Sequence, residues 1–392
     1  MKRRAAVLLA AFALGAILVF VRNQEAAPDL PSVASPASSV PVSNVDAGAM
    51  PGSAPDKHYM TQFDVTEKTI RGLPTPGCEE RARQRQEDAR QLDLSSIVPD
   101  AVATLRHSGD TEQLLAAALM STDRKELQEL LDRVLVDDPG SRVAHWKNLQ
   151  NCNAMGSDCE RRSVEAAALA VDSANGLVWI DIAGARMREK RWQEAEDALR
   201  RAAAAPRFDS YFIEYALLVE RGLSATSELG YTDRMIAGIG FAAAMAIPGY
   251  AGITQRCTGE TGGYEIPAEI CFELGKRMAG NSRELIAILI GKSVQQDAAS
   301  RLGYDRLARE LQREQNELRD AVLRDNADSG APVLLQNDAT VLQRYVDTFA
   351  AHGEIRATEA LVAEARRLRE DPAYDQCNFV GNPDFELEPM VP

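Results

Sequence analysis

Apolar and polar positions follow a helical period along nearly all of the chain beyond residue 77. Between residues 108 and 209, apolar side chains return every three to four positions, in segments that repeat with a period of about 34 residues. In the first unit this spacing predicts helices at 111–121 and 124–137, and a turn at Asp138-Pro139-Gly140 closes the unit. We therefore expect an all-α fold in which the helices pair as hairpins.

The third unit, after residue 175, shows the repeat most clearly. Its first helix carries a large residue and then an aliphatic–small pair, its second helix opens on an aromatic residue and is small at its centre, and a proline follows. These positions are Trp179, Ile182, Ala183, Trp192, Ala195, Ala202 and Pro206. The pattern resembles the tetratricopeptide repeat (TPR) family. It departs from that family at Arg186, where the family has tyrosine, and at Lys190, where it has a turn glycine.

The resemblance covers residues 108–209, within a TPR-like segment that we place at 78–209. It implies a solenoid of helix hairpins whose concave face grips a peptide or a partner protein, without catalysis. Arg186 and Trp192 are then candidate partner contacts, and a structural role is the alternative for both. An irregular helical bundle with alanine-rich packing is the alternative fold for this segment.

Helical patterns continue from 210 to 370 as an irregular C-terminal stack. Residues 210–223 are predicted to form its first helix, and the apolar run 235–247 predicts a fully buried helix, because it is too short to span a bilayer. Asn281 and Glu284 resemble a capping box at the start of a strongly apolar helix. The acidic residues 371–392 are predicted to be a tail.

The N-terminus carries a membrane signal. Residues 1–4 include three basic side chains, and an uncharged apolar run extends from Ala5 to Val21. This favours a single transmembrane helix in a bacterial inner membrane, with residues 1–4 cytoplasmic and the bulk of the chain periplasmic. Cleavage of the run as a signal peptide, which would give a secreted or periplasmic protein, is the alternative. Residues 22–77, rich in Pro, Ala and Ser, predict a disordered linker.

All six cysteines lie beyond this linker, which is typical of disulfides in an exported domain. Six cysteines permit about fifteen complete pairings. A zinc site is the alternative, although the chain has no Cys-x-x-Cys pair and no Cys/His cluster at zinc spacing. Proximity along the chain, followed by elimination, favours the pairs Cys152–Cys159, Cys257–Cys271 and Cys78–Cys377.

Charge and motifs limit the chemistry to be expected. The chain has 44 Lys plus Arg against 58 Asp plus Glu, so its acidic domain repels phosphate backbones and we expect no nucleic-acid partner. The motifs of nucleophilic and zinc hydrolases are absent from the sequence, so we predict no catalytic residue, cofactor or metal. Glu265 and Glu269, beside a glycine-rich loop, are the carboxylates that suggest a general acid/base pair; a solvated helix start is the alternative.

Three functions are compatible with these features. A membrane-anchored scaffold that binds a protein or peptide is the function that the repeat resemblance implies. A cell-envelope enzyme, for example a hydrolase with its site between Gly262 and Glu269, is the second. A structural subunit of an envelope assembly is the third.

Overall fold

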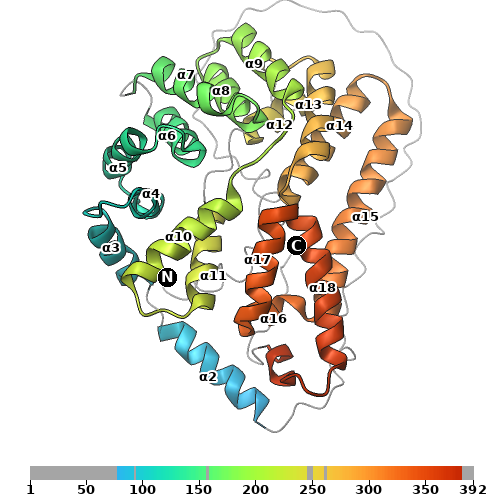
Figure 1. Ribbon diagram of the computed structural model, residues 1–392. Helices are drawn as coiled ribbons and strands as arrows, with labels where there is room; N and C mark the ends of the chain where they lie inside the picture. Colours follow the sequence, from blue (N-terminus) through green and yellow to red (C-terminus); the bar gives the residue numbers. More distant parts are fainter. Residues whose placement is uncertain (1–76, 92–93, 156–158, 245–249, 260–262, 382–392) are drawn as a thin grey trace, which may run out of the picture. The chain divides into compact units, whose positions relative to one another are not determined.

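The computed structural model describes residues 77–91, 94–155, 159–244, 250–259 and 263–381, all within one compact unit. These residues form seventeen α-helices and one 3-10 helix, with isolated bridges in place of strands, which confirms the all-α class (Figure 1). The helices are α2 (Cys78–Gln91), α3 (Leu94–Leu105), α4 (Thr111–Met120), α5 (Arg124–Asp137), α6 (Arg142–Met155), α7 (Arg161–Asp172), α8 (Gly176–Arg188), α9 (Trp192–Ala204), α10 (Phe212–Thr226), α11 (Tyr231–Ala244), α12 (Tyr250–Thr258), α13 (Ala268–Asn281), α14 (Leu285–Arg301), α15 (Asp305–Ser329), α16 (Ala331–Asn337), α17 (Ala339–His352), α18 (Glu354–Glu370) and η2 (Gln376–Phe379).

The predicted membrane anchor, Ala5 to Val21, lies outside the described residues, as does the linker up to residue 76. Among the helices from α2 to α18, none combines the length and the apolar character needed to cross a bilayer. The anchor and the linker therefore stay predictions.

The helices from α4 to α9 pair as hairpins at the positions that the repeat spacing predicts. Local capping explains where the first pair begins. The Asp110 carboxylate accepts a hydrogen bond from the backbone N–H of Glu112 (2.9 Å), and Asp123 accepts one from that of Lys125 (2.8 Å). Each aspartate satisfies an otherwise unpaired donor in the first turn and so fixes the start of α4 and of α5.

Covalent and backbone features fix the turns of the next two hairpins. Cys152 in α6 is bonded to Cys159, just before α7, so the second hairpin is stapled at its turn. Lys190, between α8 and α9, has a φ of 59°, in the left-handed region that favours glycine. The lysine therefore adopts the backbone conformation for which the repeat family uses glycine at this turn.

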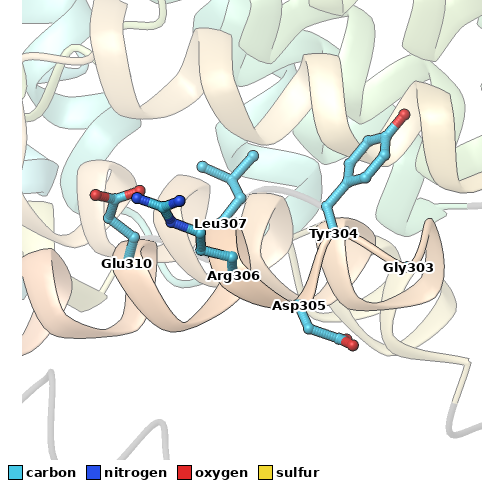
Figure 2. A pocket seen from close by; sticks show the side chains of 6 residues that line it. All are labelled: Gly303, Tyr304, Asp305, Arg306, Leu307 and Glu310. Carbon is cyan, nitrogen blue, oxygen red and sulfur yellow. The ribbon is translucent and has the colours of Figure 1, made fainter.

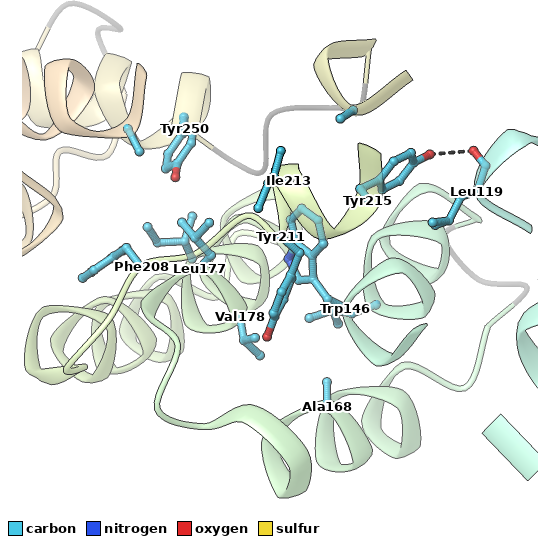
Figure 3. Close-up of a cluster of buried hydrophobic side chains, with 14 of the residues drawn as sticks. Leu119, Trp146, Ala168, Leu177, Val178, Phe208, Tyr211, Ile213, Tyr215 and Tyr250 are labelled. Atoms are coloured by element: carbon cyan, nitrogen blue, oxygen red, sulfur yellow. Dashed lines mark hydrogen bonds between the residues drawn. The ribbon is translucent and has the colours of Figure 1, made fainter. Parts of the chain in front are cut away.

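The first helices of the first two hairpins, α4 and α6, are covered on a second side by α10 and by Tyr211, the residue just before it. The Tyr211 ring, at the start of α10, meets that of Trp146 in α6 edge-on, with centroids 5.7 Å apart, and the Tyr215 hydroxyl donates to the Leu119 carbonyl of α4 (2.5 Å; Figure 3). Farther along, a Cβ at Gly222 would lie 2.7 Å from that of Ala116. In an open solenoid each repeat contacts only its neighbours, so this return of α10 to α3 and α4 is a departure from that architecture.

Two expectations for the C-terminal half are wrong. The apolar run 235–247 was expected to form a helix buried all round, but α11 ends at Ala244 in the described residues and buries one side only, with Met235, Ala237 and Gly238 inside and Phe241 half-buried. A long apolar run therefore does not require burial on every face. Residues 281–284 do not form a capping box either. Asn281 is still part of α13, and the Glu284 side chain accepts hydrogen bonds from Ser210 instead of capping its own helix.

The described part of the acidic tail is folded onto α2 and α16 rather than loose. Cys377 in η2 is buried and bonded to Cys78, the first residue of α2. Arg81, one turn along α2, pairs with Asp375 (2.8 Å), and Asn337 at the end of α16 donates to the Asn378 carbonyl (3.0 Å). The disulfide therefore connects the start of the helical domain with its C-terminal segment.

The crossing of α13 and α14 depends on two glycines. A Cβ at Gly275 would lie 2.5 Å from the backbone nitrogen of Gln295, and one at Gly291 would lie 2.5 Å from that of Ala279. The neighbour is backbone in both cases and cannot rotate away. We expect Gly275→Ala to lower the free energy of unfolding by about 1–3 kcal/mol in urea denaturation. Gly280→Ala is the matched control, because open space surrounds its Cβ position; equal losses would refute the close crossing.

Candidate functional site

An aromatic stack brings together residues that lie far apart in the sequence. Trp192, the first residue of α9, stacks on Tyr264, with ring centroids 4.7 Å apart and planes 9° from parallel. The Arg256 guanidinium of α12 lies 4.9 Å from the centre of the Trp192 ring and donates to the Tyr264 carbonyl (2.9 Å). Trp192 and Tyr264 are both half-buried, so this stack combines a fixed geometry with accessible edges.

Polar contacts hold the Tyr264 side of the stack. The Tyr264 hydroxyl donates to Glu196 of α9, and this hydrogen bond raises the pKa of Tyr264 above its usual range. The second Glu196 oxygen accepts from Arg200 (3.3 Å). Glu196 itself is buried, so the tyrosine is tied to a carboxylate whose position is fixed by packing.

Covalent and ionic links fix the segment that carries Tyr264. The Cys257–Cys271 disulfide joins α12 to α13 across the glycine-rich loop. Arg301, the last residue of α14, donates to the carbonyls of Cys257 (2.7 Å) and Ile266 (3.0 Å) and pairs with Glu265 (3.2 Å). Both ends of the loop are therefore anchored by neighbouring helices.

The four candidate residues from the sequence occupy different environments. Trp192 lies in the stack, and Glu265 adjoins it but is engaged by Arg301. Glu269 lies exposed in the first turn of α13, where a carboxylate favours the helix dipole. Arg186 is buried away from the surface: it binds both carboxylate oxygens of Glu165, the first at 2.9 Å, and the placement corresponds to the structural alternative.

A surface hollow of about 420 Å³ lies at the start of α15 (Figure 2). It is lined by Gly303, Tyr304, Asp305, Arg306, Leu307 and Glu310. Tyr304 is 54% exposed and meets Phe272 edge-on, with centroids 6.5 Å apart. Tyr304 is thus a second accessible tyrosine packed on one aromatic ring.

A buried polar junction forms where the linkers before α10, α14 and α18 meet. The backbone N–H of Phe208 donates to the Asn281 carbonyl (3.1 Å), and that of Glu354 donates to the Arg283 carbonyl (2.8 Å). The Glu354 carboxylate in turn accepts from the N–H of Leu285 (2.7 Å) and so caps α14 from another helix. These contacts join the linkers before α10, α14 and α18 to one another.

Glu284 lies at the centre of this junction and is 4% exposed. Its Oε1 accepts from both the N–H and the hydroxyl of Ser210, each at 3.0 Å, whereas its Oε2 is buried with no hydrogen-bond partner in the described chain. Burial, and then the charge of Asp209, raise the pKa of Glu284 to about 8. The sequence pattern gave no sign of this role, since a glutamate before an apolar helix is typical of a cap.

Buried acidic groups continue into the hairpins. Trp146 Nε1 donates to Asp181 of α8 (2.9 Å), and burial raises the pKa of that carboxyl to about 7. In the described ranges, no group of three or more His, Cys, Asp or Glu side chains is placed to hold a metal ion. The site thus presents aromatic and charged side chains at its surface, and its interior holds buried carboxyl groups whose pKa is raised. Comparison of the chain with protein-family models, curated proteins and solved structures finds no match.

Proposed function

We propose that this chain is a membrane-anchored, periplasmic interaction module that binds a protein or peptide partner at the Trp192–Tyr264 stack. The stack carries the proposal. Tryptophan, tyrosine and arginine are the residues enriched at the energetic centres of protein interfaces, and here all three are held in one ordered cluster. An ordered cluster loses little side-chain entropy when it binds.

The location of the partner surface follows from α10. A TPR-like solenoid is expected to bind its partner on the face of its first helices, and we retain that resemblance for α4 to α9. In this chain Tyr211, just before α10, and Tyr215 of α10 already contact α6 and α4 on that face. A partner therefore needs another surface, and the stack beside the glycine-rich loop is accessible at the end of the α8–α9 hairpin.

The compartment is supported by the cysteines. All six are paired in the described residues, as Cys78–Cys377, Cys152–Cys159 and Cys257–Cys271. Disulfides persist in oxidising compartments such as the periplasm and are rare in the cytosol. The pairs agree with an anchor at Ala5 to Val21 that leaves the domain outside, and N-terminal sequencing of the exported protein tests that anchor: a start near residue 28 would refute it.

Crosslinking followed by affinity purification from membranes tests the binding role. We expect the full-length chain to recover a stoichiometric protein partner, and Tyr264→Ala to reduce recovery by about tenfold or more, as for an interface hot spot. Tyr304→Ala is the matched control, because it also removes an accessible tyrosine from one aromatic contact. Equal recovery with the two variants would refute the stack as the binding surface, and a chain that is always recovered alone would refute the binding role.

A further inference from the structure

The junction around Glu284 combines features that a purely structural contact does not need. Its carboxylate is buried and has no cation within ion-pair distance among the described residues, and only one of its two oxygens is hydrogen-bonded. A buried carboxylate is stable as an anion only when paired or fully hydrogen-bonded. The neutral acid therefore fits this position better than the anion.

The charged and titratable groups around Glu284 reinforce that preference. Arg207 is engaged by Asp172 and lies 3.6 Å from Asp209, and Arg283 is directed to α17 through the Phe349 carbonyl (3.1 Å). The other titratable groups near this junction are carboxyl and hydroxyl groups. Asp209, in the linker before α10, and Tyr250 in α12 interact electrostatically with Glu284 itself. One step farther out, Glu214 in α10 interacts with Asp209, Asp181 in α8 interacts with Tyr250, and Glu354 in α18 binds the N–H of Leu285.

Carboxylate oxygens and hydroxyls are both found among the buried atoms that lack a partner in this region of the described chain, and the Ser282 hydroxyl is one of them. The Oε2 atoms of Glu214 and Glu284 and the hydroxyl of Tyr250 are buried without a hydrogen-bond partner in the described chain. Burial and the charge of Asp209 raise the pKa of Glu214 as well. An added negative charge at Glu284 would therefore meet repulsion from Asp209, and its Oε2 has no donor among the described residues.

We propose that Glu284 is a proton-binding switch: while protonated it keeps the linkers before α10, α14 and α18 docked together, and loss of the proton loosens the junction. Ser210 connects the switch to the α9–α10 linker, because both of its donors bind the Glu284 carboxyl group. The proton is exchanged with solvent, and no further reactant takes part. The switch lies in the interior of the domain and does not depend on the proposed partner.

The direction of the pH effect follows from the raised pKa. Between the ordinary pKa of a glutamate and about 8, the folded state holds a proton that the unfolded state has lost. The contribution of Glu284 to the free energy of unfolding is fully present below that interval and falls as the pH rises through it. The unfolding equilibrium constant gains up to about tenfold per pH unit from this one group.

Infrared spectroscopy and hydrogen exchange on the full chain test the switch. We expect the difference spectrum between wild type and Glu284→Gln to contain a protonated-carboxyl band at pH 6 that is lost near pH 8. Amide exchange at Phe208 and Ser210, corrected for its intrinsic pH dependence, should accelerate over the same range in wild type and stay constant in Glu284→Gln. Glu310→Gln, an exposed change on α15, should behave like wild type.

Ser210→Ala supplies a second test that does not require Glu284→Gln to fold. The two donors of Ser210 favour the anion of Glu284, and loss of the hydroxyl removes one of them. The carboxyl band should then persist to higher pH than in wild type. Absence of the band at pH 6, an unchanged band in Ser210→Ala, or equal exchange in wild type and Glu284→Gln would each overturn the proposal.

Discussion

Arg186→Met is expected to lower the free energy of unfolding by about 3–5 kcal/mol, because it leaves the Glu165 carboxylate buried without its cation. The two side chains are 11% and 8% exposed, and the guanidinium contacts both oxygens of Glu165. Glu194, the other carboxylate near Arg186 at 3.3 Å, is half-exposed and keeps its contact with Arg191. The decrease in the free energy of unfolding should therefore come from the unpaired Glu165 carboxylate.

Denaturant titration under oxidising conditions measures this effect, with two controls. Replacement of both partners, as Arg186→Met with Glu165→Met, should recover most of the lost stability, since apolar residues of similar size can replace a buried pair. Arg356→Met removes a surface pair with Glu359, whose side chains are 73% and 58% exposed, and should change stability by no more than about 1 kcal/mol. Similar losses for Arg186→Met and Arg356→Met would contradict the buried ion pair.

Much of the helical architecture could be predicted from local sequence. Asp110 and Asp123 cap α4 and α5, and the repeat spacing places both helices, because capping and amphipathic periodicity act over only a few residues. The cysteine pairs also follow from the order of the cysteines along the chain. Short separations favour closure of Cys152–Cys159 and Cys257–Cys271, and one pair is then left.

Long-range packing could not be predicted from local sequence in this way. The periodicity of α10 shows which of its faces is apolar, but not that Tyr215 and Gly222 would meet α4, about a hundred residues earlier in the chain. For the same reason the apolar run 235–247, most of which lies in α11, was taken for a helix buried on all sides. A period identifies the buried face of a helix and does not identify its partner.

The candidate site was predicted only in part. Trp192 and the glycine-rich loop were singled out separately, and the fold brings them together through Tyr264. Glu284 was misassigned because a glutamate next to an apolar helix matches a capping signal, whereas its side chain bonds Ser210 across 74 positions of sequence. Arg186 looked like a partner contact because nothing local indicates that Glu165 will face it. Side chains that act across the fold leave no local signature.

Replacement of Cys78 and Cys377 by serine is the second change with a large expected effect. Their disulfide spans a sequence separation of 299 and so constrains the unfolded chain over almost the whole helical domain. In the chain-entropy account such a loop contributes about 5 kcal/mol of stability. Because only Cys78 and Ala82 of α2 are buried among its described side chains, α2 should also detach when the bond is removed.

Two measurements separate these consequences in the double variant Cys78→Ser with Cys377→Ser. Hydrogen exchange should become fast along α2 and η2 while α4 and α8, whose side chains are largely buried, stay protected. In denaturant titration, this variant should lose more free energy of unfolding than a variant without a short-loop disulfide, and the loss should affect the whole helical domain. The matched control is Cys152→Ser with Cys159→Ser, which removes a disulfide of separation 7 and should lose only about 2 kcal/mol. A smaller loss from the long loop than from the short one, or continued protection of α2, would contradict the role assigned to Cys78–Cys377. The expected order, together with fast exchange along α2, would show that this bond is needed to hold α2 to the C-terminal segment in addition to the Arg81–Asp375 pair.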